Sequence, residues 1–152
     1  GEFFATDIAG PGNCYWIKAY KNGQFLNKPA EINLAYDAGF SPGSNVDGIP
    51  FIQPIRQGIN AMDEGSDGNT LPSFIPGDSV YVEIYSIAYP AFNFLTEVNI
   101  QTNRPGGFGE LFSQPLSNVS TNIVSANLSM NAIGFFNVSA VTGLGQRVVE
   151  KK

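Results

Sequence analysis

The 152-residue chain contains no histidine. This excludes a Ser–His–Asp or Cys–His nucleophile system and any His-ligated zinc or iron site within the chain. Its one cysteine, Cys14, excludes an intrachain disulfide framework and a cysteine-rich zinc site. Because Cys14 opens a strand-like stretch, we expect it to be a small core residue and not a nucleophile.

Charged residues are also few, at 14% of the chain, against about 25% in an average domain. The net charge is −5, and the eight basic residues are scattered without forming a basic patch. Nucleic-acid affinity rests largely on neutralising phosphates, so we expect no nucleic-acid partner. No apolar run approaches the roughly 18 residues that cross a bilayer.

The residues that are abundant are apolar or turn-forming. The chain has 12 Phe, 6 Tyr and 1 Trp, which is enough aromatic material for a hydrophobic core. It also has 17 Gly and 10 Pro, about half again the usual share, which favours many turns over a helical bundle. The length fits one domain over residues 1–152.

Strand patterns recur along the sequence. In residues 13–25 the side chains alternate, and Asn22-Gly23 is typical of a two-residue hairpin turn. Residues 78–87 also alternate, and Tyr and Ile on their second face predict a central strand. Further strands are expected at 31–37, weakly at 118–125, and at 132–142 and 144–150, with a turn-like GLG at 143–145. Residues 48–55 are expected to be extended, and their two prolines place them at a sheet edge or in a covering loop.

After residue 87 the pattern changes from strand-like to helical. Pro90 suits the first turn of a helix, where its missing N–H costs nothing. Apolar residues then recur at i, i+3, i+4 and i+7, namely Ala91, Phe94, Leu95 and Val98. The helix should end near Thr102-Asn103, before Pro105. In the irregular segment that follows, we expect the core to hold Phe108, Leu111 and Phe112.

Together these patterns predict a mostly β fold. We expect a β-sandwich or open barrel of about seven short strands, with one α-helix packed on the sheet. The helix would cover an open end or an edge of the sheet, where unpaired backbone groups otherwise invite aggregation.

The best candidate metal site is the acidic, glycine-rich stretch DEGSDGN at residues 63–69. Asp63, Asp67 and Asn69 offer the hard oxygen ligands that Ca²⁺ prefers, although the EF-hand spacing is absent. The alternative is a solvated turn, because Asp and Asn cap turns with their own side chains. No cofactor is expected unless these residues bind calcium.

Catalysis would have to rely on carboxylates. A glycoside hydrolase needs two of them across a cleft, and Glu83 and Glu97, which lie on predicted regular elements, are the pair considered. No spacing signature supports that pair, so we expect no enzymatic activity. Trp16 suits stacking on a sugar, but a half-buried strand aromatic is the simpler interpretation.

Several stretches together resemble one known family. They are YWIKAYKNG at 15–23, DEGSDGNT at 63–70, PGDSV to YSI at 76–87 with the helix after it, NVSTN at 118–122, and GFFNVSAV at 134–141. The family is the Bacteroidetes lipoprotein group called domain of unknown function 4249. The similarity covers nearly the whole chain, except for residues around 38–60.

The resemblance implies a cellular location and does not imply an activity. Members are lipid-anchored, extracytoplasmic proteins of the outer membrane, often beside nutrient receptors. Full members carry a lipobox cysteine and an N-terminal immunoglobulin-like region, so residues 1–152 would be a C-terminal portion, and membrane association would depend on a lipid anchor absent from this sequence. The family has no established catalytic residues to carry over.

We therefore expect a non-enzymatic cell-envelope domain that binds a glycan, another nutrient or a partner protein such as an outer-membrane receptor. Two alternatives remain open. One is a carboxylate-dependent glycan hydrolase, which needs two carboxylates roughly 5–9.5 Å apart across a cleft. The other is a purely structural β module, which would lack a concave pocket and expose one apolar patch.

If Asp63 and Asp67 bind calcium, the cation should stabilise the folded state by mass action. The melting temperature should then rise with calcium, by roughly 2–4 °C for each kcal/mol of binding-linked stability. Thermal melts with calcium and with chelator measure this, and Asp67→Asn should remove the difference. Identical melts in both conditions would exclude the site.

Overall fold

A computed structural model of the chain describes residues 3–26, 32–51, 53–59, 74–113, 118–126 and 134–150. Over these residues the fold is mostly β, with seven strands in two antiparallel sheets, 31% strand and 22% helix, and it is not a closed barrel. The fold class expected from the sequence is confirmed.

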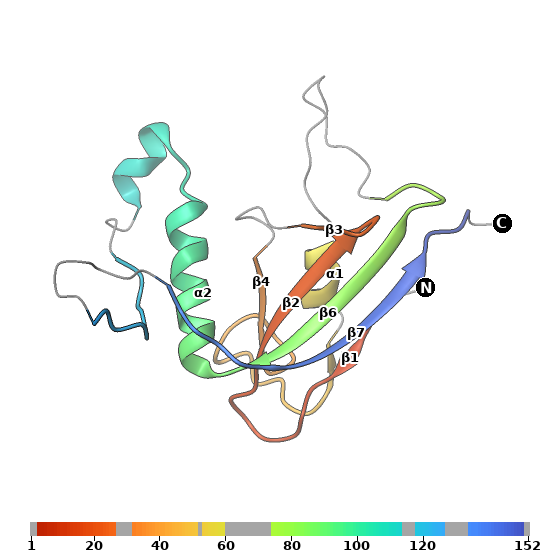
Figure 1. Ribbon diagram of the computed structural model, residues 1–152, viewed down its shortest axis with the longest axis horizontal. Helices are drawn as coiled ribbons and strands as arrows, with labels where there is room; N and C mark the ends of the chain where they lie inside the picture. Colours follow the sequence, from red (N-terminus) through yellow and green to blue (C-terminus); the bar gives the residue numbers. More distant parts are fainter. Residues whose placement is uncertain are drawn as a thin grey trace.

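The larger sheet has five strands (Figure 1). They are β2 (Cys14–Lys21), β3 (Gln24–Phe25), β4 (Asn33–Tyr36), β6 (Ser79–Ile87) and β7 (Ala140–Arg147). β6 lies between β2 and β7, which confirms the central strand, while β3 and β4 share the other edge of β2.

The hairpin between β2 and β3 turns at the predicted residues. Asn22 and Gly23 have φ values of 51° and 80°, as a type I′ turn requires at both central positions. Asn22 also donates from its side-chain amide to Asp78 and accepts from the Ser79 amide. The turn is therefore fastened to the start of β6.

The smaller sheet pairs β1 (Ala5–Thr6) with β5 (Pro50–Phe51), and the helix α1 (Gln53–Ile59) follows. The expectation that 48–55 would be extended throughout is therefore wrong from Gln53 onward. Pro54 lies in the first turn of α1, where a helix tolerates proline because the N–H there has no partner anyway.

Each face of the larger sheet carries its own hydrophobic cluster. The first joins β2, β4 and β6 to β5 and α1 through Tyr15, Ile17, Ala35, Phe51, Ile55, Val80 and Val82. The second joins the other face to α2 (Tyr89–Thr102) through Cys14, Ile87, Ala91 and Phe92. Alternation along β2 explains the split, because Cys14 and Tyr15 point to opposite sides.

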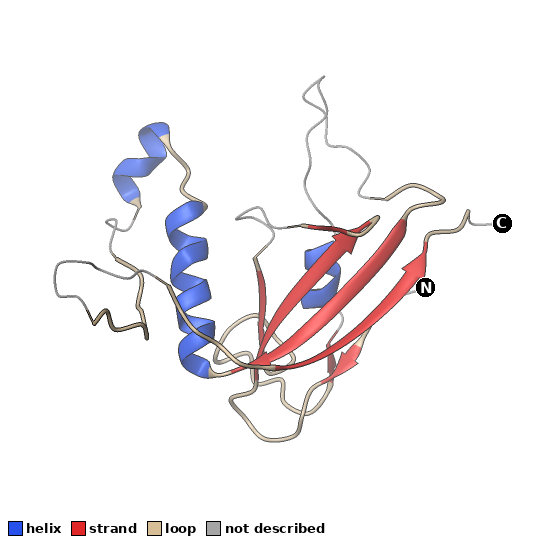
Figure 2. Cartoon of the chain, viewed as in Figure 1, coloured by secondary structure: helices blue, strands red, loops and turns tan. Residues whose placement is uncertain are grey.

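The predicted helix is confirmed, with Pro90 in its first turn and Asn103 as its C-cap. Its first half does the packing: Ala91 and Phe92 are buried, and Leu95 lies against the second cluster, whereas Ile100 is exposed. Figure 2 shows α2 beside the sheet, nearest to it at the helix's first turns.

Three expectations for the C-terminal third are wrong. Phe108, Leu111 and Phe112 do not reach the core; they project from a 3₁₀ helix, η2 (Gly107–Phe112), and are 74–81% exposed. Residues 118–126 form no strand.

The third concerns the last strands, because one continuous strand, β7, replaces the two expected at 132–142 and 144–150 and runs through the GLG stretch. The reason is tertiary: Tyr81 on β6 lies against Gly143 and Gly145. A Cβ at Gly143 would sit 2.4 Å from the Tyr81 hydroxyl. These glycines therefore make room for the ring without ending the strand.

Phe92→Ala should lower the free energy of unfolding by about 3–5 kcal/mol, because it opens a cavity where α2 meets the sheet. Ile100→Ala on the same helix is the matched control, since Ile100 is 47% exposed. Urea melts of both variants test this. Equal losses would contradict the packing described for α2.

Cys14 should behave as the core residue that the sequence predicts. It is buried, and burial together with the nearby charge of Asp37 raises its thiol pKa to about 11. Since the thiolate is the reactive form, Ellman's reagent should modify the native protein slowly at pH 8 and the urea-unfolded protein quickly. Because the folded pKa is raised, the associated stability should be lost as pH rises from about 9 to about 11. Cys14→Ala should lack that component, and fast native modification would contradict the assignment.

Candidate functional site

The most distinctive surface is one face of the β2–β6 pair. The register sets Trp16 opposite Tyr85, Lys18 opposite Glu83, and Tyr20 opposite Tyr81. Opposed residues in an antiparallel pair point to the same side, so these six side chains share a face. Phe25 of β3 joins them opposite Tyr20. We call these seven residues the aromatic face: Trp16, Lys18, Tyr20, Phe25, Tyr81, Glu83 and Tyr85.

A cation lies at the centre of the aromatic face. The Lys18 ammonium is 4.0 Å from the ring centroid of Trp16 and 4.3 Å from that of Tyr85. This geometry is a cation–π contact, in which the negative face of the ring attracts the charge. Burial lowers the pKa of Lys18, and the charge of Glu83 opposes that shift. The ammonium is thus held in place by its own strand and by β6.

Beside the cation, Glu83 organises two hydroxyl groups. Tyr20 and Tyr85 each donate a hydrogen bond to Oε2 of Glu83, at 2.7 and 2.8 Å. Burial, followed by these bonds to Glu83, raises the pKa of both tyrosines. The phenols therefore stay neutral, and each oxygen keeps lone pairs that can accept a further hydrogen bond.

Tyr81 provides a flat platform at the edge of this face. Its ring lies against Gly143 and Gly145 of β7, and an added Cβ at Gly145 would be 3.1 Å from the ring. Its side chain nevertheless remains 42% exposed. The ring thus rests on the glycine strand, with the tilted Tyr20 ring 5.9 Å away between centroids, and its exposed part is available for stacking.

The two carboxylates considered for hydrolysis have separate surroundings. Glu83 accepts from Tyr20 and Tyr85, whereas Glu97 on α2 accepts from the amide and hydroxyl of Ser120, at 2.7 and 2.5 Å. The Ser120 bonds lower the pKa of Glu97. The two side chains share no hydrogen-bond partner in the described structure, so their networks do not connect.

The structure also brings together three carboxylates that the sequence did not predict to be neighbours. Oxygens of Asp7, Asp37 and Asp47 lie within 4.8 Å of one another, although the residues come from different loops. Asp37 accepts from the amides of Gly12 and Asn13, both at 2.8 Å.

The other two carboxylates of this acidic cluster are also bonded. Asp7 accepts from Tyr15 and Gly48, and Asp47 accepts from Gly10. Carboxylates are suitable ligands for a hard cation. The hydrogen bonds of these three carboxylates to neighbouring loops already explain why they lie together, without a bound ion. The residues expected to bind calcium, Asp63, Asp67 and Asn69, lie outside the described residues.

Comparisons with known proteins identify no relative. No family model matches the chain, and searches of curated proteins and of solved structures also find no match. The resemblance to the lipoprotein family therefore stays a prediction. Among the described residues, no helix is long and apolar enough to cross a membrane.

Proposed function

We propose that the chain is a non-catalytic binding domain that takes a glycan on its aromatic face. The observation that carries this proposal is the set of aromatic rings around Lys18 and Glu83. They lie on a sheet face that is only partly covered by the hydrophobic core. Tyr81 and Phe25 are 42% and 38% exposed and belong to neither hydrophobic cluster. Only Trp16 and Tyr85 pack toward the second cluster.

The chemistry of this face matches a sugar ring. The axial C–H groups of a pyranose form an apolar patch, and its rim carries hydroxyl groups. An exposed ring such as Tyr81 can stack on the apolar C–H patch. Lys18 can donate hydrogen bonds to the sugar hydroxyl groups, and Glu83 can accept hydrogen bonds from them. Stacked bases are a poorer fit, because Glu83 and the net charge of −5 disfavour a phosphate backbone.

The place of action follows from the resemblance alone. A domain that captures a glycan beside an outer-membrane nutrient receptor would be extracytoplasmic and held by a lipid anchor. The absence of histidine supports binding over catalysis.

A partner protein is the second candidate, and β7 favours it. All eight residues of this strand are exposed, and among the described strands only β6 pairs with it. Its other edge thus offers backbone groups to which an extended segment of a receptor could add a strand. If no glycan binds, co-purification with an outer-membrane nutrient receptor, the partner that the resemblance implies, tests this candidate.

Tyr81→Ala should weaken glycan binding roughly tenfold, the equivalent of about 1.4 kcal/mol, because it removes the exposed stacking platform. Affinity gel electrophoresis against soluble polysaccharides, followed by calorimetry on those that retard the protein, measures the effect. Phe108→Ala is the matched control, since Phe108 is an exposed aromatic on η2, outside the aromatic face. The proposal fails if both variants bind like the unmodified protein, or if no polysaccharide is bound.

A further inference from the structure

The last strand of the large sheet, β7, has an open outer edge. All eight of its residues are exposed, including Val141 at 55% and Leu144 at 65%. Natural sheets protect such edges with lysine, proline or a bulge. β7 contains neither lysine nor proline, its register with β6 is unbroken, and its single charge, Arg147, lies at its end. This edge is therefore open to pairing with a further strand.

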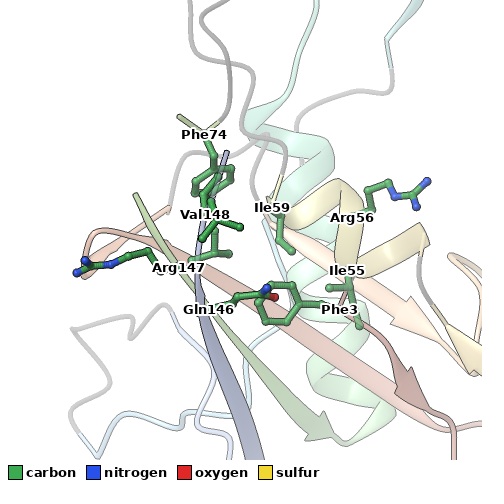
Figure 3. A pocket seen from close by; sticks show the side chains of 10 residues that line it. Phe3, Ile55, Arg56, Ile59, Phe74, Gln146, Arg147 and Val148 are labelled. Carbon is green, nitrogen blue, oxygen red and sulfur yellow. The ribbon is translucent and has the colours of Figure 1, made fainter. Parts of the chain in front are cut away.

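Side chains along β7 alternate between the two faces of the sheet. Gln146 and Val148 point toward the main core, where they line an apolar pocket of about 270 Å³, whereas the Arg147 side chain points away from it (Figure 3). Leu144 lies opposite Val82 of the main core, so it is on the same face as Gln146. Leu144 is thus a large apolar side chain beside the core that stays uncovered.

Backbone groups along β7 alternate in the same way. The amide of Val148 donates to the carbonyl of Asp78, just before β6, so every second residue back to Ala140 also points its N–H and C=O toward β6. The residues between them direct these groups outward, namely Val141, Gly143, Gly145 and Arg147. These four positions are placed symmetrically about Leu144.

We propose that β7 pairs antiparallel with β7 of a second copy of the chain, in a symmetric register centred on Leu144. Val141 then lies opposite Arg147 of the second copy, and Gly143 lies opposite Gly145, so the outward backbone groups of all four residues gain partners. The two Leu144 side chains meet at the two-fold axis. They form a non-hydrogen-bonded pair, in which opposite side chains approach most closely, and each covers the other.

A second copy fits this edge because a two-fold interface requires a self-complementary surface. In β7 the outward backbone groups are symmetric, the uncovered leucine lies on the axis, and the two Arg147 charges are held at opposite ends. The axis is perpendicular to the sheet, so the aromatic faces of both copies lie on the same side of one continuous sheet. This inference goes beyond the glycan proposal and gives the edge an occupant other than a receptor segment.

Sedimentation velocity from micromolar to millimolar protein tests the dimer, which should be weak because a strand edge is a small interface. Leu144→Lys should weaken dimerisation roughly tenfold or more, because it places two like charges at the axis. Val124→Lys is the matched control, at an apolar residue 93% exposed and outside β7, and should dimerise like the unmodified protein. A monomer at every concentration, or a dimer that Leu144→Lys leaves unchanged, would overturn the proposal.

Cysteine cross-linking tests the register independently. Leu144→Cys should form a disulfide-linked dimer under mild oxidation, because the two side chains lie directly opposite each other. Thr142→Cys should not, because Thr142 lies opposite Gln146 of the second copy in this register. The native Cys14 is buried and does not compete. Equal cross-linking of the two variants would contradict the proposal.

Neither measurement contains a glycan. A failure of the glycan proposal is therefore distinguishable from a failure of the dimer.

Discussion

The antiparallel pairing of β2 with β6 is the interaction on which the other elements depend. Eight residue pairs, from Cys14–Ile87 to Lys21–Val80, hold together two strands that are distant in the sequence. β3 and β4 attach to the outer edge of β2, and β7 attaches to the outer edge of β6. Because strand side chains alternate, this one register also decides which residues lie on each face.

The consequence of that register is a sheet with two different faces. One face sends Ile17, Val80 and Val82 into the main core, beneath α1 and the small sheet. The other begins as core at Cys14 and Ile87, under α2, and becomes the aromatic face further along the strands. The Lys18 and Glu83 charges are tolerated there because cation–π contacts and tyrosine hydroxyls replace part of their hydration.

Several large apolar side chains lie outside the hydrophobic core. Phe108 and Phe112 contact each other edge to face on η2 while remaining mostly exposed, and Phe136 and Val138 are also exposed. The exposed edge at β7 lies in the same C-terminal third, apart from the aromatic face on β2, β3 and β6.

The sequence by itself determined the elements whose signals are local. The Asn22-Gly23 turn, the alternation of β6 and the period of α2 all depend on near neighbours in the chain, and all three are confirmed. It also limited the chemistry, because a chain without histidine cannot build a Ser–His–Asp or Cys–His nucleophile system.

Tertiary structure decided what depends on distant partners. The glycines of β7 continue a strand only because Tyr81 lies against them, and the acidic cluster exists only where three loops meet. Whether an apolar residue such as Phe108 is covered, and where a pocket opens, depends on packing between segments that sequence periodicity does not relate. Local patterns encode backbone preference, whereas burial is a property of the assembled chain.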